Sequence, residues 1–461
     1  MRSAAGTVST RNSKAADPAA SGCADGRRVG FHTFGCKLNQ VETEALASSF
    51  KSQGFSIVSA EDEAEAYIVN TCTVTARADH KARALIRGLA RRRPRALLLV
   101  TGCSAQLEAA ALEALAPNIV VVPQAEKSRL LDLPGILRSA KGLPGAAQTG
   151  EALHRGGPAD PFALAAKALT FHTRAFLKIQ DGCDAWCTYC RVPAARGPSQ
   201  SLPMTEVVAR AAALEADGHR EIVITGVNIS AWKEGALRLP DLLRAILQAT
   251  GKTRIRLSSL EPDAITTDLG QVLAHERICP HFHLPVQSGS NAILGAMKRR
   301  YAIERVAEGV SLLRAVKDDP FIAADLIVGF PGETVEDFDA TRRLVDVLGF
   351  SALHIFPFSA RPGTAAAALH PMVPERIRSQ RAHELASVSR GRRLAYARAW
   401  IGREVDVLLE NSAKGRLLGT SGNYLKVSVA GAPNGASGRL ARVEISAAEP
   451  SCTGVFLSFR P

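Results

Sequence analysis

The stretch "KIQDGCDAWCTYCRVPAARG", residues 178–197, places three cysteines on one short segment, directly after an apolar run that predicts a strand. Cys183, Cys187 and Cys190 have the spacing Cys-x3-Cys-x2-Cys. Three thiolates this close on one loop can each bind a different iron of a single [4Fe–4S] cluster, which leaves the fourth iron open. A zinc site would need a fourth ligand and is usually built from Cys-x2-Cys pairs, and none lies nearby in the sequence. The spacing therefore favours an iron–sulfur cluster over zinc or chance.

Six strand-like segments surround this loop and alternate with amphipathic helical segments: 176–180, 221–226, 254–259, 281–289, 321–332 and 352–359. Six such units in a row predict an open or partial barrel whose functional groups gather at the carboxyl ends of the strands. The cysteine loop follows the first of these strands. An open iron placed there could chelate the amino and carboxylate groups of S-adenosylmethionine and pass it an electron.

A second alternating pattern precedes the barrel. Helical segments at 42–54 and 83–92 lie between four strand-like segments at 29–35, 66–72, 96–103 and 118–123, which predicts another parallel sheet. Cys36, Cys72 and Cys103 each stand where one of these strands ends. A buried, inert thiol would be the default for any one of them. Because the carboxyl ends of parallel strands share one edge of the sheet, we expect the three thiols to converge.

The composition divides the chain into five parts. An Ala/Ser-rich extension (1–27) precedes an N-terminal α/β domain (28–137), and a linker rich in Gly, Pro and Ala (138–168) follows. The barrel (169–398) and a small all-β module (399–461) complete the chain. The extension lacks the apolar segment of a secretory signal, so we expect it to be disordered, with an organellar transit peptide as the alternative. No apolar run is long enough to predict a membrane span. The predicted fold class is α/β with a small all-β barrel at the end.

The remaining cysteines match no ligand pattern. Cys23 lies in the extension, Cys279 is expected to end a helix, and Cys452 is expected in a turn, so we interpret all three as structural. No paired framework of cysteines is left over, which indicates a reducing cytoplasm.

The charge of the chain indicates a polyanionic partner. The formal net charge is +13, and residues 371–461 hold 14 Lys/Arg against 7 Asp/Glu. A second basic segment covers residues 75–95, where a helix would align Arg83, Arg87 and Arg91 on one face. A solvated helix face is the alternative reading of one charged helix, but two basic regions favour nucleic acid. With 5% aromatic residues, extensive base stacking is not expected.

The cysteine loop resembles the signature of radical-SAM methylthiotransferases, which attach a methylthio group to an unreactive C–H carbon. The resemblance runs from about residue 30 to the end and includes "FGCKLNQVETE", "VNTCTVTARADHKAR", "VTGCSAQ", "RLSSLEP", "HLPVQSGS", "MKRRY", "DLIVGFPGET" and "FPFSARPGTAA". It implies an N-terminal methylthiotransferase domain, a partial (β/α)6 radical-SAM barrel and a C-terminal RNA-binding β-barrel of the TRAM type. It also implies a second [4Fe–4S] cluster held by Cys36, Cys72 and Cys103, again with one open iron.

The chemistry implied by the resemblance uses both clusters and two molecules of S-adenosylmethionine. The cluster on Cys183, Cys187 and Cys190 would cleave one molecule to methionine and a 5′-deoxyadenosyl radical, which abstracts hydrogen from the target carbon. The N-terminal cluster would carry the sulfur, the second molecule would methylate it, and the substrate radical would take the methylthio group. The resemblance further implies an electron donor such as flavodoxin or ferredoxin, a sulfur donor and a monomeric enzyme.

The same resemblance suggests residues that contact S-adenosylmethionine. Tyr189 matches an aromatic residue packed beside the adenine, and Gly226 matches a turn that contacts the methionine amino group. Polar contacts could come from Glu261, Gln287 and Ser288, and Gly329 would allow a close backbone approach. For each of them, a turn or packing role is the alternative.

The substrate is suggested by the motif that follows Cys36. "GCKLNQVETE" resembles the branch that methylthiolates C2 of N6-threonylcarbamoyladenosine next to the anticodon of tRNA, and "SSLEP", "MKRRY" and "FSARPGTAA" favour the same branch. The alternatives are isopentenyladenosine in tRNA, or an iron–sulfur RNA-binding protein without catalysis. The chain departs from the family pattern at Arg191, where an aliphatic residue is usual, and at Ala194, where an aromatic residue is usual. The departure leaves local packing and substrate fit open.

Overall fold

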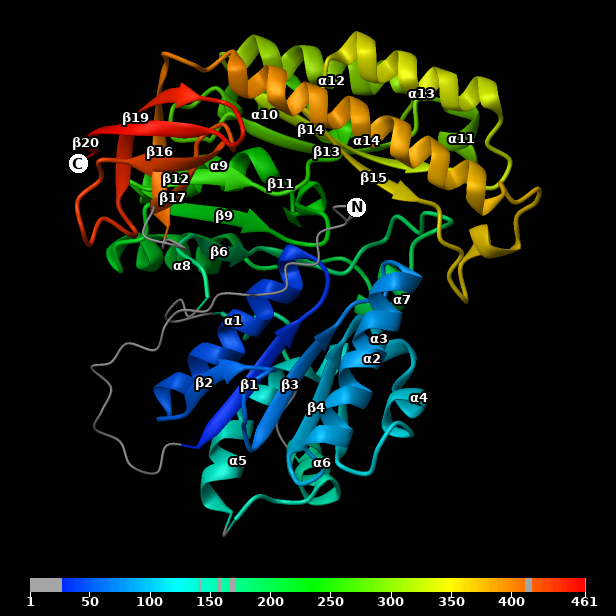
Figure 1. Cartoon of the computed structure of the whole chain (residues 1–461), viewed down its shortest axis with the longest axis vertical. Coiled ribbons are helices and arrows are strands. Elements are labelled where there is room, and N and C mark those ends of the chain that lie inside the picture. The colour runs from blue at the N-terminus through cyan, green and yellow to red at the C-terminus, as the bar shows by residue number, and fades with distance from the viewer. Residues whose placement is uncertain (1–26, 141, 156–158, 166–170, 411–416, 461) are drawn as a thin grey trace.

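The structure is a computed structural model that describes the chain except residues 1–26, 141, 156–158, 166–170, 411–416 and 461. The predicted disordered extension and Cys23 therefore lie outside the described residues, apart from Arg27. Figure 1 shows three parts: an N-terminal α/β unit in blue and cyan, a larger barrel-like unit in green to orange, and a small β-barrel in orange-red to red. In the described part of the chain, no helix has the length and apolar content needed to cross a bilayer.

The N-terminal unit is a five-stranded parallel sheet in the order β2-β1-β3-β4-β5. Its strands are β1 (Arg28–Thr33), β2 (Ser56–Ser59), β3 (Ala66–Thr71), β4 (Leu97–Gly102) and β5 (Ile119–Pro123). Every residue of β3 and β4 is buried, because helices cover both faces of the sheet. The four predicted strands are present, and β2 was missed, since this edge strand is short and contains only two apolar residues.

Helices connect these strands as the alternating pattern predicts. They are α1 (Lys37–Ser52), α2 (Ala76–Arg92), α3 (Cys103–Leu107), α4 (Ala109–Glu113), the 3-10 helix η1 (Gln124–Leu131) and α5 (Leu133–Ser139). Helices α1 and α2 begin earlier than their apolar patterns suggest, and α2 is capped by the Thr75 side chain, which accepts from the amide of Ala78.

The predicted linker is not a bare connection. It contains α6 (Ala146–His154), in which Leu153 is buried in the N-terminal core. Further along, Phe162 is buried in the core of the barrel and Leu164 in the N-terminal core. The Gly/Pro/Ala composition predicted a linker, whereas this segment packs onto both units.

The central unit contains the six predicted parallel strands in two sheets, ordered β12-β9-β6 and β13-β14-β15. They are β6 (Ala175–Lys178), β9 (Glu221–Thr225), β12 (Arg254–Leu257), β13 (His281–Gln287), β14 (Phe321–Val328) and β15 (Ala352–Pro357). Two isolated bridges, Ile255 to Ile278 and Ser259 to His283, join the sheets. The result is the expected partial barrel.

The helices that cover this barrel are α8 (Met204–Ala216), α9 (Leu239–Ala249), α10 (Thr267–Leu273), α11 (Asn291–Ala296), α12 (Ile303–Val316), α13 (Val335–Leu348) and α14 (Glu375–Arg398). Smaller elements are β7 (Gln180–Asp181), α7 (Val192–Arg196), β8 (Gln200–Ser201), β10 (Lys233–Glu234), β11 (Leu237–Arg238) and the 3-10 turns η2 (Ile229–Ala231), η3 (Pro262–Ala264) and η4 (Ala365–Ala368). Cys279 is buried in the segment before β13, so the expectation that it ends a helix is wrong.

Side chains alternate between two different environments along the barrel strands. Residues such as Ile224, Leu284 and Leu326 pack under the helices in the main core. The intervening residues point to the opposite face, which carries charged and polar groups such as Arg256 and His283. We refer to this opposite face as the inner face of the barrel.

The C-terminal unit is a closed five-stranded barrel in the order β16-β17-β18-β20-β19. Its strands are β16 (Glu404–Glu410), β17 (Leu417–Ser421), β18 (Lys426–Ala430), β19 (Leu440–Ala447) and β20 (Thr453–Phe459), and Cys452 lies just before β20. Arg254 and Arg256 of the central unit donate to four backbone carbonyls of this barrel: Asp406, Thr420, Ser421 and Gly422. The ring of Tyr424 stacks on that of His281, 4.1 Å between centroids. The fold class is thus confirmed, while the domain limits remain a prediction.

Candidate active site between two cysteine groups

The first cysteine group lies at one edge of the N-terminal sheet. Cys36, Cys72 and Cys103 directly follow or closely follow β1, β3 and β4, which are neighbours in the sheet. Gly35 has a positive φ of 102°, and a Cβ added there would lie 2.7 Å from the Cys72 sulfur. The close approach therefore requires glycine. The topology therefore places all three cysteines at one edge of the sheet, and that they hold one cluster stays a prediction.

The chemistry of this first group suits a metal cluster. Burial, together with the neighbouring Cys103 and Cys36, raises the pKa of Cys72 to about 12, and burial also raises the pKa of Cys103. These thiols would ionise at neutral pH only with a nearby positive charge such as a metal centre. None of the cysteines that the structure describes forms a disulfide. Three unpaired thiols that share one sheet edge fit the predicted ligand set.

The second group lies on the loop after β7. Each of its sulfurs accepts a hydrogen bond: Cys183 from the amide of Ala185 (3.5 Å), Cys187 from Arg299 Nη1 (3.2 Å) and Cys190 from the amide of Val192 (3.4 Å). Burial raises the pKa of Cys183 and raises that of Cys190 to about 12, while the backbone donors act in the opposite direction. Donors on all three sulfurs would stabilise bound thiolates.

A buried network of charges joins the two cysteine-bearing units, and we refer to it as the interdomain ion network: Glu42, Lys127, Lys178, Asp181 and Arg196. Arg196 Nη1 lies 2.9 Å from Glu42 Oε1 and 3.0 Å from Asp181 Oδ1. Burial alone would raise the pKa of Glu42, but the three cations of the network hold it well below its usual range. Helix α1, which starts beside Cys36, is thereby fixed to the segment that follows Cys190.

Arg191, the residue that departs from the family pattern, makes a second connection between the units. Its Nη1 donates to Thr73 Oγ1 (2.8 Å) and to Glu108 Oε1 (2.9 Å), both in the N-terminal unit. An aliphatic side chain could make neither bond. Ala194 is exposed on α7, so the missing aromatic leaves no gap in the core.

The three predicted RNA-binding arginines of α2 lie in different environments. Arg83 pairs with Asp79 and Glu108, which ties it to the protein itself. Arg87 and Arg91 are exposed on the same helix. Only these two keep the solvent-facing position that an RNA contact needs.

A pocket of about 170 Å³ lies beside Cys187, and among the predicted cofactor contacts it includes Glu261. Its wall also contains Asn228, Ser230, Arg299 and Tyr301, none of which was singled out from the sequence. Arg299 donates to the Glu261 carboxylate and to the Cys187 sulfur. The motif "MKRRY" contains Arg299, so the family resemblance could have identified this residue. Nothing in the motif indicates that Arg299 contacts the cysteine loop.

The other predicted cofactor contacts lie outside that pocket wall. Tyr189 packs against the apolar cluster that contains Met297 and Phe330. Gln287 has a positive φ of 68°, and the buried Ser288 hydroxyl lies 3.4 Å from that of Thr341.

The two predicted glycines have packing reasons of their own. A Cβ at Gly226 would meet the backbone oxygen of Gln180 at 2.9 Å. At Gly329, which has a φ of 70°, it would collide with the side chain of Arg378. Close packing accounts for both glycines, and their contact with a cofactor stays a prediction.

Comparison with known proteins places these sites in a family. Residues 28–123 match the uncharacterized protein family UPF0004, and residues 177–345 match the Radical SAM superfamily. The chain is 38% identical to the threonylcarbamoyladenosine tRNA methylthiotransferase MtaB of Treponema pallidum, over 87% of this chain and 94% of that protein. It is 34% identical to a tRNA-2-methylthio-N(6)-dimethylallyladenosine synthase of Cereibacter sphaeroides, over 93% and 98%.

A solved structure supports the fold. The radical S-adenosylmethionine methyltransferase TsrM from Kitasatospora setae, which holds cobalamin and a [4Fe–4S] cluster, aligns with a TM-score of 0.54 over 74% of each chain, at 16% identity. Membership of the Radical SAM superfamily implies a [4Fe–4S] cluster and S-adenosylmethionine. With its two matched regions and its full-length relatives, the chain belongs to the radical-SAM methylthiotransferase family of enzymes.

Proposed function

We propose that this enzyme methylthiolates C2 of N6-threonylcarbamoyladenosine next to the anticodon of tRNA, using two [4Fe–4S] clusters and two molecules of S-adenosylmethionine. The observation that carries the proposal is the pairing of two three-cysteine groups across one interface. Arg191 and Arg196 follow the second group in the chain. Arg191 bonds to Thr73, one residue after Cys72, and Arg196 bonds to Asn39, three residues after Cys36. Two cysteine groups held this way can serve one reaction.

The choice of nucleoside rests on the sequence around Cys36 and on the relatives. "GCKLNQVETE" has the threonylcarbamoyl pattern, and the relative named for that nucleoside is more similar to this chain than the one named for dimethylallyladenosine. The second candidate function is therefore methylthiolation of isopentenyladenosine. A non-catalytic RNA-binding protein would have no need of a pocket that contains both Cys187 and a partly buried carboxylate, Glu261, in its wall.

Residues of this chain would divide the work as follows. Cys36, Cys72 and Cys103 would hold one cluster and Cys183, Cys187 and Cys190 the other, while Glu261 and Arg299 border the pocket for S-adenosylmethionine. When bound, these cofactors supply the radical and sulfur chemistry, and the protein orients and shields it. Arg87, Arg91 and the C-terminal barrel would bind the RNA backbone. An electron donor such as flavodoxin or ferredoxin and a sulfur donor would complete the cycle, with the enzyme a monomer in a reducing cytoplasm.

Iron counting tests the two-cluster part. Anaerobic reconstitution should give about eight irons per chain, and Cys72→Ala or Cys187→Ala should each reduce the count to about four. A count of about four in the unmodified protein would refute the second cluster.

Nucleoside analysis of tRNA from a deletion strain tests the substrate. Methylthio-threonylcarbamoyladenosine should disappear while its unmethylthiolated precursor accumulates. Persistence of this nucleoside, with methylthio-isopentenyladenosine missing instead, would establish the second candidate.

A further inference from the structure

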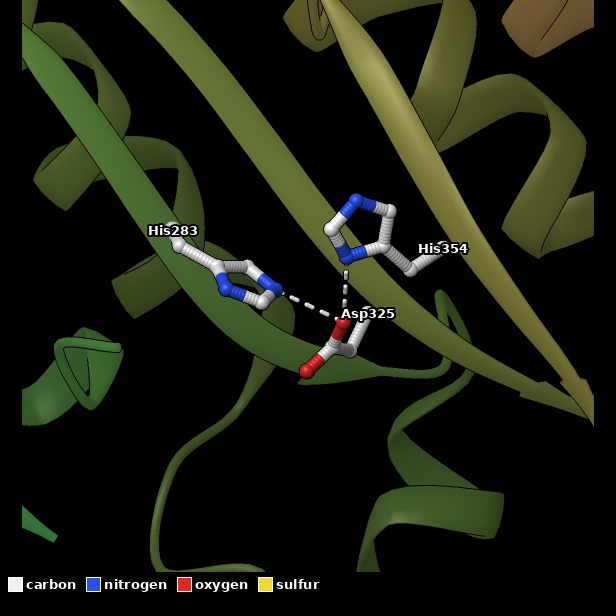
Figure 2. Close-up of side chains that lie close together, drawn as sticks. All are labelled: His283, Asp325 and His354. Atoms are coloured by element: carbon white, nitrogen blue, oxygen red, sulfur yellow. Dashed lines mark hydrogen bonds and ion pairs between the residues drawn. The ribbon is translucent and has the colours of Figure 1, made fainter. Parts of the chain in front are cut away.

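A polar group on the inner face of the barrel has no part in the chemistry described above. His283, Asp325 and His354 lie side by side on β13, β14 and β15, and both rings point a nitrogen at Asp325 Oδ1 (Figure 2). The distances are 2.7 Å from His283 Nε2 and 3.2 Å from His354 Nδ1. The three side chains keep 14%, 20% and 40% of their exposure, in strand order, so the group is accessible to a ligand.

A lysine from the other unit reaches the same face. Lys37 is the first residue of α1, directly after Cys36, and its partly buried ammonium lies within electrostatic range of Asp325, Tyr424 and Arg256. Among the residues that the structure describes, no carboxylate lies within ion-pair distance of this ammonium. A partly desolvated charge without a counter-ion is costly, and a bound anion would remove the cost.

The charge around Lys37 and Tyr424 is positive. Five basic side chains face three carboxylates there: Lys37, Arg174, Arg254, Arg256 and Lys426 against Glu221, Asp325 and Glu410. Burial alone would raise the pKa of Tyr424, yet four of these cations lower it to about 8: Lys37, Arg174, Lys426 and Arg256.

Two histidines and a carboxylate are also a common metal site, and their donor atoms lie within 4.8 Å of one another. The positive surroundings weigh against a divalent cation. Asp325, which could attract one, is already neutralised in part by hydrogen bonds from both rings. An anionic ligand with additional hydrogen-bonding groups suits this face better.

We propose that the inner face of the barrel binds the threonylcarbamoyl substituent of the substrate base, with Lys37 pairing the carboxylate and the His283–Asp325–His354 group hydrogen-bonding the hydroxyl and urea. This inference rests on the proposed function and adds the residues that select the substrate. A dimethylallyl group has neither a charge nor a hydrogen-bonding atom, so it would leave the Lys37 ammonium without a counter-ion. Sites built to bind polar groups strongly reject analogues that lack them.

Binding to an anticodon stem-loop tests the proposal with the reconstituted full chain. The wild type should bind the loop with threonylcarbamoyladenosine more tightly than the same loop with adenosine, and Lys37→Gln should lose about 100-fold toward the modified loop only. Conversion of the threonine carboxylate to an amide should weaken wild-type binding to a similar degree. Asp325→Asn should lose part of the preference. Lys51→Gln, at the exposed far end of the same helix, is the matched control.

The outcomes distinguish a failure of the proposed function from a failure of the proposed substrate-binding residues. Failure of the wild type to methylthiolate the threonylcarbamoyl loop refutes the proposed function. Two results together overturn this inference alone. The wild type methylthiolates the threonylcarbamoyl loop normally, and Lys37→Gln at full iron content still prefers that loop over the adenosine loop as strongly as the wild type does. A stoichiometric metal ion beyond the cluster iron that is lost in His283→Ala would also overturn it, because the group would then be a metal site.

Discussion

Replacing Glu42 by glutamine would remove the central anion of the interdomain ion network. The Glu42 side chain is fully buried, and its three cationic partners, Lys127, Lys178 and Arg196, are at most 3% exposed. Two of the contacts are 2.5 Å and 2.9 Å long. After the substitution, Asp181 would be the only carboxylate left in the network for three buried cations.

The expected cost follows from this geometry. Removal of one partner from a buried ion pair costs about 3–5 kcal/mol, and the glutamine oxygen still accepts a hydrogen bond, so the lower end, about 3 kcal/mol, applies. Because 1.36 kcal/mol corresponds to a factor of ten, opening of the interface should become about 100-fold more frequent. Glu151→Gln is the matched control, since its pair with Arg155 is 71–81% exposed and should contribute less than about 1 kcal/mol.

Native-state hydrogen exchange of amides in α1 and in the segment 178–196 measures this opening directly. Their exchange should accelerate about 100-fold in Glu42→Gln, with no comparable change in Glu151→Gln. A second substitution, Lys127→Gln, should restore part of the loss because it removes one unpaired cation. Equal exchange rates in Glu42→Gln and in the control would refute the role given to the network.

Acid should imitate this substitution. The network holds the pKa of Glu42 well below its usual range, so its stabilisation is complete above the unfolded pKa of about 4.3 and is lost as the pH falls through the folded value. Glu42→Gln should therefore show a weaker loss of stability below about pH 4 than the wild type, measured by urea unfolding.

Further predictions concern the interface, the thiols, the C-terminal barrel and the RNA. Arg191→Leu removes two hydrogen bonds to the N-terminal unit and should raise the yield of 5′-deoxyadenosine per methylthio group formed, measured by chromatography. In cluster-free protein, Cys72 should react slowly with a thiol reagent at pH 8 and speed up only toward its pKa of about 12; fast reaction at pH 8 would contradict this. Arg256→Met should cost about 3–5 kcal/mol and release the C-terminal barrel to limited proteolysis, because it leaves Glu221 and two carbonyls without this donor. The double substitution of Arg87 and Arg91 by glutamine should reduce the salt slope of tRNA binding by about 2, whereas an unchanged slope would exclude both from the RNA contact.

The sequence predicted those features that depend on local pattern and topology. Cys36, Cys72 and Cys103 stand at strand ends, and parallel strands that are neighbours in a sheet must bring such positions to one edge. The triplet at 183–190 needed only its own spacing. Failures occurred where the pattern was weak: β2 is a four-residue edge strand, and α6 is a short helix inside a Gly/Pro/Ala-rich segment.

The amino-acid sequence by itself determined the two cysteine groups, the order of the three units and the resemblance to a family. Ligand spacing and hydrophobic periodicity involve residues that are close together in the sequence, so they can be recognised without a structure. Only the tertiary structure decided how the units meet. Glu42 and Arg196 are 154 residues apart, and Lys37 comes from a different unit than Asp325, so no local pattern relates them. These two interactions, the Glu42–Arg196 ion pair and the longer-range attraction between Lys37 and Asp325, exist because the N-terminal unit packs against the barrel. Low solvent exposure there makes each charge depend on groups from the other unit.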